Sequence, residues 1–139
     1  MNKQIIYISD FFVEQELGGA ELIDNNIESF FIISNFRNLG HRYRERLTYE
    51  ARYIIYEHDH KYLRSRNPAK FRDFEAPCTE IQNYFFYKNA EKVFCQSNFH
   101  KEIVLKNLDI DNVVTVNGNL WSLEILQKLR NLCDREKKD

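Results

Sequence analysis

The sequence predicts an α/β protein, a Rossmann-like three-layer domain built on a parallel sheet of about five strands. Three observations lead to this prediction. Short apolar segments of strand length alternate with helical patterns five times along the chain. The apolar segments lack regular polar positions, which is typical of strands covered on both faces. Only 4 glycines and 2 prolines occur in 139 residues, which favours regular elements joined by short loops.

The same patterns place the elements in order along the chain. The predicted strands are Gln4–Ser9, Phe30–Ser34, Tyr53–Glu57, Lys92–Gln96 and Val113–Val116. A helical pattern follows each strand: Ala20–Ile27, then the spacing of Tyr43, Leu47 and Ala51, then that of Ile81, Tyr84 and Phe85, and finally two helices capped by Ser97 and Ser122. Alternation of this kind implies right-handed crossovers, helices on both faces of the sheet, and a ligand crevice at the carboxyl ends of the strands.

The composition excludes several classes of protein. A hydrophobic content of 43%, with 14% aromatic residues, excludes a disordered chain. The formal charge of −1 excludes bulk attraction to nucleic acid or to an anionic membrane. No apolar run approaches the roughly 20 residues of a membrane helix, and the first residues do not resemble a signal peptide.

The cysteines and the charged end of the chain bear on location and domain organisation. Cys78, Cys95 and Cys133 are odd in number and form no CxxC motif, so we expect a reduced, cytoplasmic protein. By length, residues 1–133 form a single domain. Residues 134–139 are expected to be a charged tail or a truncated linker.

A glycine pair lies on the first strand-to-helix connection. Gly18 and Gly19 precede Glu21 at the start of the first predicted helix. Glycines there let backbone N–H groups approach an anion, and the helix N-terminus adds a partial positive charge. The alternative is an ordinary tight turn in which Glu21 only complements the helix dipole.

Three polar residues follow the third predicted strand. On an extended backbone, His58 and His60 would project to one side and Asp59 to the other. Because no third and fourth ligand can be named, a metal site is less favoured than residues that bind a substrate hydroxyl or move a proton. The alternative is that these histidines only satisfy local hydrogen bonds.

A basic stretch comes next. Lys61, Arg64, Arg66, Lys70 and Arg72 place five positive charges in twelve residues, with two aromatic residues between them. This stretch is interpreted either as a solvated loop or as a patch for phosphate-bearing or acidic ligands. Stacking of nucleic-acid bases is a further alternative. The segment 10–28 carries six acids and no base, so the two stretches are also able to neutralise each other.

Four segments resemble a known family when taken in order: YISDFF with GGAEL, then IIYEHDHKYLRSRNP, then AEKVFCQSNFHKEIVLKNL, then VNGNLW. Together they resemble the N-terminal, acceptor-side half of GT-B glycosyltransferases of the family 1/family 4 type found in phages and bacteria. The resemblance covers nearly the whole chain. It implies half of a GT-B fold, in which a second, donor-binding domain completes the enzyme.

The resemblance also implies roles for individual residues. It places Gly18 and Gly19 near the donor diphosphate and His58 against the transferred sugar. Asp59 is expected to orient the sugar and its hydroxyls together with His58. Ser97 and Asn98 match a substrate-binding loop of the family. His60, Lys61, Arg64, Arg66 and Glu21 complete the expected binding set, with no metal and no cofactor.

The expected function is therefore hexosyl transfer from a nucleotide-sugar to a carbohydrate or other hydroxyl acceptor. The chain ends where the donor-binding domain would begin, and the resemblance is internally shortened after the GGAE helix. We therefore expect the isolated chain to be inactive. The alternatives are a non-catalytic Rossmann-like module that binds a nucleotide or sugar phosphate and, less favoured, a nucleic-acid-binding protein that uses residues 61–72.

The last predicted helix bears on the partners of the chain. An apolar stripe runs along it through Ile125, Leu126, Leu129 and Leu132. An open stripe of this kind either folds onto the local sheet or is covered by another molecule. We expect a donor-binding domain or self-association to cover it.

Overall fold

The computed structural model describes residues 4–9, 18–118 and 122–136. Its strands are β1 (Ile5–Ile8), β2 (Phe30–Ile33), β3 (Arg52–Glu57), β4 (Lys92–Cys95) and β5 (Val113–Thr115). They form one sheet in the order β1-β2-β3-β4-β5, and every neighbouring pair is parallel. The Rossmann-like α/β class and the parallel five-stranded sheet are therefore confirmed.

The helices also follow the predicted order. They are α1 (Gly18–Asn25), α2 (His41–Glu50), α3 (Tyr84–Lys88), α4 (Asn98–Asn107) and α5 (Leu123–Glu136). Both predicted caps are present: the Ser97 hydroxyl accepts the His100 N–H at 3.1 Å, and the Ser122 hydroxyl accepts the Ile125 N–H at 3.3 Å. Helix α5 continues through residues 134–136, the first part of the expected tail.

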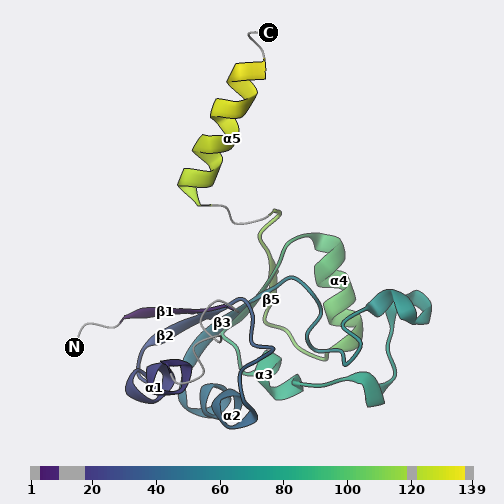
Figure 1. The fold of residues 1–139 in the computed structure, drawn as a ribbon. Coiled ribbons are helices and arrows are strands. Elements are labelled where there is room, and N and C mark those ends of the chain that lie inside the picture. Colours follow the sequence, from purple (N-terminus) through teal and green to yellow (C-terminus); the bar gives the residue numbers. More distant parts are fainter. Residues whose placement is uncertain (1–3, 10–17, 119–121, 137–139) are drawn as a thin grey trace.

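The segment between β3 and α3 is long and irregular. It contains three short 3-10 turns, η2 (Pro68–Lys70), η3 (Arg72–Phe74) and η4 (Cys78–Glu80). An antiparallel bridge between Leu63 and Ile81 closes its base. This excursion projects from the side of the domain beside α4 (Figure 1).

The strand order decides how the sheet is covered. A doubly wound sheet reverses its strand order and carries helices on both faces. Here the order is sequential, and right-handed crossovers that all advance in one direction put their helices on the same face. Figure 1 shows α1, α2 and α3 together on one side of the sheet. Helix α4 adds Val104 to the same core, and Leu108 directly after the helix joins it.

The strands consequently have one covered and one open face. Alternate positions such as Ile6, Phe31, Ile55 and Val93 are buried in the core. The positions between them are half-buried or exposed. Five of these and Val116, which directly follows β5, define what we call the open face. It surrounds a hollow of about 440 Å³ and consists of Tyr7, Ile32, Ile54, Tyr56, Phe94 and Val116.

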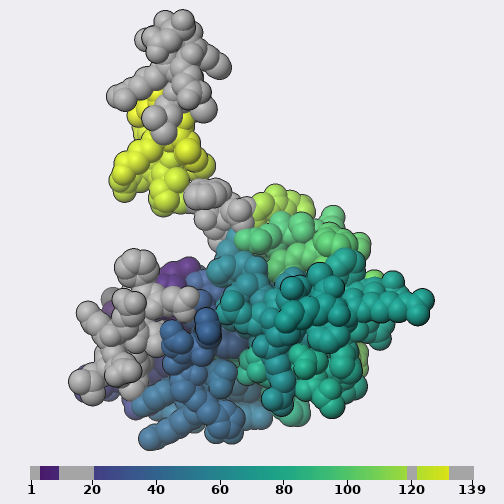
Figure 2. All heavy atoms as spheres, turned by 45° about the vertical axis from the view of Figure 1, so that its right-hand side comes forward, coloured from purple at the N-terminus to yellow at the C-terminus, as the bar shows by residue number. Residues whose placement is uncertain are grey.

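The sequence predicts helices on both faces of the sheet, but α5 does not cover the open face. Helix α5 stands away from the sheet (Figure 1) and is clear of the rest of the molecule in Figure 2. Residues 122–131 are all exposed. Across the described ranges, no helix combines the length and the apolar composition needed to cross a membrane.

Candidate functional site

The carboxyl edge of the sheet brings together several predicted residues. His58, Asp59, His60 and Lys61 follow β3, and Ser97 follows β4. Because the strands are parallel, these segments meet at one edge. Gly18 and Gly19 are the first residues of α1, while the preceding residues 10–17 lie outside the described part of the chain.

A buried carboxylate organises this edge. Glu57 is the last residue of β3 and has no exposed surface. Its Oε1 accepts the backbone N–H of Asp59 at 2.8 Å and that of His60 at 2.7 Å. Its Oε2 accepts the hydroxyl of Tyr87, a buried residue of α3. The side chain therefore fixes the turn that presents the polar residues.

His58 lies at the rim of this edge with one ring nitrogen engaged. Its Nε2 lies 2.8 Å from the carbonyl oxygen of Ser34 at the end of β2. A carbonyl oxygen only accepts hydrogen bonds, so Nε2 carries the proton. The lone pair of the neutral ring is then on Nδ1, and the residue is exposed. This tautomer allows His58 to accept a hydrogen bond or a proton from a bound hydroxyl.

Asp59 and Lys61 form an ion pair below the rim. Lys61 is only 3% exposed, and its ammonium contacts the Asp59 carboxylate and lies 3.4 Å from the Ser34 carbonyl oxygen. Arg66 approaches the other oxygen of Asp59 at 3.4 Å. Lys61 therefore has a structural role at this edge of the sheet, and Arg66 is the more accessible cation beside it.

His60 points in a different direction from the one the sequence predicted. The prediction that His58 and His60 project to one side is wrong, because β3 ends at Glu57 and His60 has a φ of +55°. His60 Nδ1 lies 2.9 Å from the Tyr62 hydroxyl, and its ring centroid is 4.5 Å from that of His100. Within the described residues, no group of three or more His, Cys, Asp or Glu side chains is placed to hold a metal ion.

The packing of His60 against His100 makes stability depend on pH. Burial, reinforced by His100, lowers the pKa of His60 to about 4, and burial also lowers the pKa of His100. In the unfolded chain, His60 becomes protonated below about pH 6.5, whereas in the folded chain it stays neutral until about pH 4. The contribution of this histidine to the free energy of unfolding is therefore fully present above about pH 6.5 and is lost progressively as the pH falls toward 4.

We expect the urea midpoint of unfolding to fall between pH 7.5 and pH 4.5, and His60→Asn to reduce that fall. Asparagine tolerates the positive φ and does not titrate. The matched control is His41→Asn on α2, where the histidine is exposed. Equal pH dependence in the wild-type chain and His60→Asn would contradict this account.

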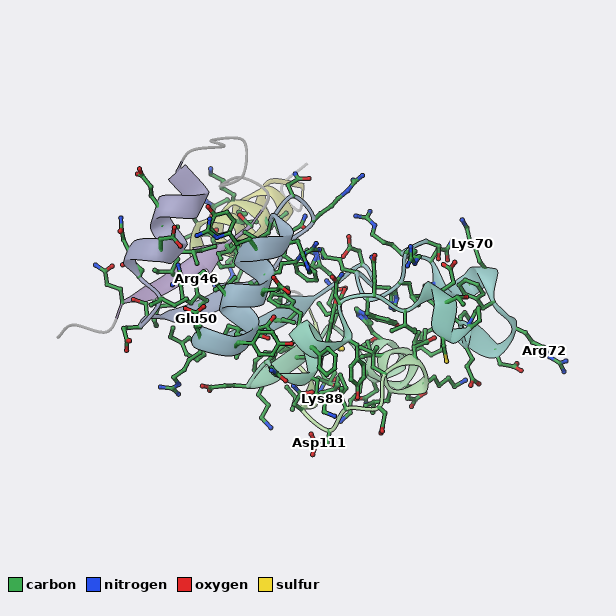
Figure 3. The ribbon with its side chains drawn as sticks, turned by 90° about the horizontal axis from the view of Figure 1, so that it is seen from below. Arg46, Glu50, Lys70, Arg72, Lys88 and Asp111 are labelled. Carbon is green, nitrogen blue, oxygen red and sulfur yellow. The ribbon has the colours of Figure 1, made fainter. Side chains whose placement is uncertain are left out.

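The basic stretch does not form a single patch. Lys61 is buried, Arg64 donates from Nε to the Thr79 carbonyl oxygen at 3.1 Å, and Arg66 faces Asp59. Figure 3 shows Lys70 and Arg72 at the outer end of the excursion, pointing outward. Three of the five positive charges are thus engaged in contacts within the protein, and the other two lie at the outer end of the excursion. Because the five do not form one surface, the nucleic-acid alternative is weakened.

The remaining predicted site residues have local structural contacts. The Ser97 hydroxyl caps α4, and Asn98 Oδ1 accepts the Thr115 hydroxyl at 3.1 Å. Glu21 is exposed in the first turn of α1. These three residues lie near strand ends. The side-chain oxygens of Ser97 and Asn98 already accept hydrogen bonds within the protein.

Three residues that shape the edge were missed by the sequence-based site prediction. Glu57, Ser34 and His100 each contact or position the histidine turn. For Glu57 there was a signal: it is an acid in register with the apolar positions Tyr53 and Ile55 of its strand. Nothing in the sequence distinguishes Ser34 from an ordinary loop residue or His100 from an ordinary helix residue.

Comparisons with protein-family models, with curated proteins and with solved structures found no match to this chain.

Proposed function

We propose that this chain is the acceptor-side half of a GT-B glycosyltransferase and that it binds sugar hydroxyls at the carboxyl edge of its sheet. The proposal rests on the hydrogen bonding of the His58 ring. Its Nε2 donates to the Ser34 carbonyl oxygen, so Nδ1 of this exposed residue is the acceptor nitrogen of the ring, beside the strand ends. The resemblance of the four sequence segments supplies the reaction class.

In this proposal His58 is the catalytic residue. Its Nδ1 accepts a hydrogen bond from a sugar hydroxyl. In transfer, it takes up the proton of the acceptor hydroxyl as that oxygen bonds to the anomeric carbon of the donor sugar. The bond from this carbon to the nucleoside diphosphate breaks at the same time, and the diphosphate leaves with the electron pair. Asp59 acts on the same turn, where its pairing with Lys61 and Arg66 holds the loop in place. The amino end of α1, which begins with Gly18 and Gly19, is available for the donor diphosphate.

A donor-binding domain completes the enzyme in this proposal, so the isolated chain binds without turnover. The proposed location is the cytoplasm, where nucleotide-sugars are available and thiols stay reduced. Of the described cysteines, Cys78 is free and exposed, and Cys95 is free and buried. Burial raises the pKa of the Cys95 thiol to about 12, so that thiol is unreactive.

A second candidate function is a non-catalytic module that binds a nucleotide or sugar phosphate. Arg66 favours it, because this partly exposed cation lies beside the His58 turn and is able to meet a phosphate. Ligand binding would then occur without any transfer, even after a donor-binding domain is added.

Isothermal titration calorimetry with UDP-glucose, UDP-N-acetylglucosamine, GDP-mannose and the free nucleotides tests the proposal. We expect His58→Ala to weaken binding of the preferred nucleotide-sugar about 10-fold, the loss of one hydrogen bond. His41→Ala, at an exposed histidine of α2, is the matched control and should leave binding within about twofold. No binding of any compound, or equal loss in both variants, would contradict the proposal.

A further inference from the structure

Two apolar surfaces are uncovered in this chain at the same time. The first is the open face of the sheet, whose central residues Ile32, Ile54 and Phe94 surround the hollow of about 440 Å³. The second is the stripe on α5, where Ile125, Leu126 and Leu129 are 41%, 47% and 48% exposed. Contiguous apolar surface of this kind normally marks an interaction site.

The two surfaces match in length and pattern. Helix α5 has 14 residues and is therefore about 21 Å long. Strand β3, with 6 residues, extends about 20 Å across the open face. The residues Ile125, Leu126 and Leu129 recur at helical spacing on one side of α5, as expected of a helix that covers a sheet.

The start of the connection to α5 is held at the carboxyl edge. The Gly118 N–H donates to the Gln96 carbonyl oxygen at 2.8 Å, and the Tyr56 hydroxyl lies 3.5 Å from the Gly118 carbonyl oxygen. From this anchor α5 points away from the sheet of its own chain (Figure 1). Its stripe is consequently presented to a neighbouring molecule.

We propose that the occupant of the open face is α5 of a second copy of this chain. Two copies exchange their final helices reciprocally, so each open face is covered by the helix of its partner. Such an exchange gives a closed, two-fold symmetric dimer and needs no surface beyond those already uncovered. This inference is independent of the proposed glycosyltransferase function.

Sedimentation velocity of the full chain over a range of concentrations tests the proposal. We expect a dimer, with Leu129→Glu raising its dissociation constant about 100-fold or more, because two buried leucines are lost per dimer. Gln127→Glu places the same charge on the opposite side of α5 and is the matched control, expected to leave the dimer intact. Circular dichroism confirms that each variant is folded.

Mixing two variants distinguishes exchange from packing of α5 on its own sheet. Ile54→Lys disrupts the open face and should be monomeric by itself, like Leu129→Glu. An equimolar mixture should recover dimer, because the heterodimer keeps one wild-type contact between α5 and the open face. A wild-type monomer, a dimer insensitive to Leu129→Glu, or a mixture that stays monomeric would each overturn the proposal.

Discussion

Replacing Glu57 by alanine is expected to lower the free energy of unfolding by about 4 kcal/mol. The substitution leaves the partly buried N–H groups of Asp59 and His60 and the buried hydroxyl of Tyr87 without their acceptor. Each such loss costs about 1–3 kcal/mol when the group is buried. A domain with a typical stability of about 5–15 kcal/mol would lose a large part of it, as urea denaturation would show.

Glu57→Gln separates the role of the acceptor from that of the charge. Its carbonyl oxygen still accepts both backbone N–H groups, and its amide is able to donate to Tyr87, so we expect a loss of only about 1 kcal/mol. Glu75→Ala is the exposed control, with an expected effect below about 0.5 kcal/mol. If Glu57→Ala were as mild as the control, Glu57 would not organise the edge.

Replacing Asp59 by alanine is the second large effect that we expect, with a loss of about 3 kcal/mol of unfolding free energy. The substitution leaves the ammonium of Lys61, which is 3% exposed, without its carboxylate. Removing one partner of a buried pair is costly because the other charge remains desolvated.

The double variant Asp59→Ala/Lys61→Met tests this reason directly. Methionine fills a similar volume without a charge, so we expect the double variant to return to within about 1 kcal/mol of the wild type. Lys61→Met alone completes the double-mutant cycle, and Arg66 then remains beside Asp59. A double variant as unstable as Asp59→Ala would show that the loss does not come from the stranded ammonium.

Much of the fold could be predicted because strand and helix periods are local properties. The five strands and the caps at Ser97 and Ser122 follow directly from apolar runs and cap residues. The open face could not be predicted, because Ile32, Ile54 and Phe94 are as apolar as residues of a covered strand. Which face remains uncovered depends on strand order, a long-range property that short patterns do not encode.

The site was predictable to a similar extent. His58 and Ser97 were located because each follows a strand, and strand ends of a parallel sheet share an edge. The burial of Lys61 was not predictable, because its partners at Asp59 and Ser34 depend on how the turn after β3 folds. The positive φ of His60 likewise depends on the hydrogen bonds that Glu57 provides.

Chemical-shift mapping by NMR tests the central claim, that the carboxyl edge of the sheet is the ligand site, most directly. The isotope-labelled chain is titrated with the nucleotide-sugar preferred in calorimetry, and backbone amides are followed. We predict the largest shifts at residues 34–36, 58–61 and 97–98, with those at 58–61 abolished in His58→Ala. Shifts centred on the open face or on α2, with residues 58–61 unchanged, would contradict the claim.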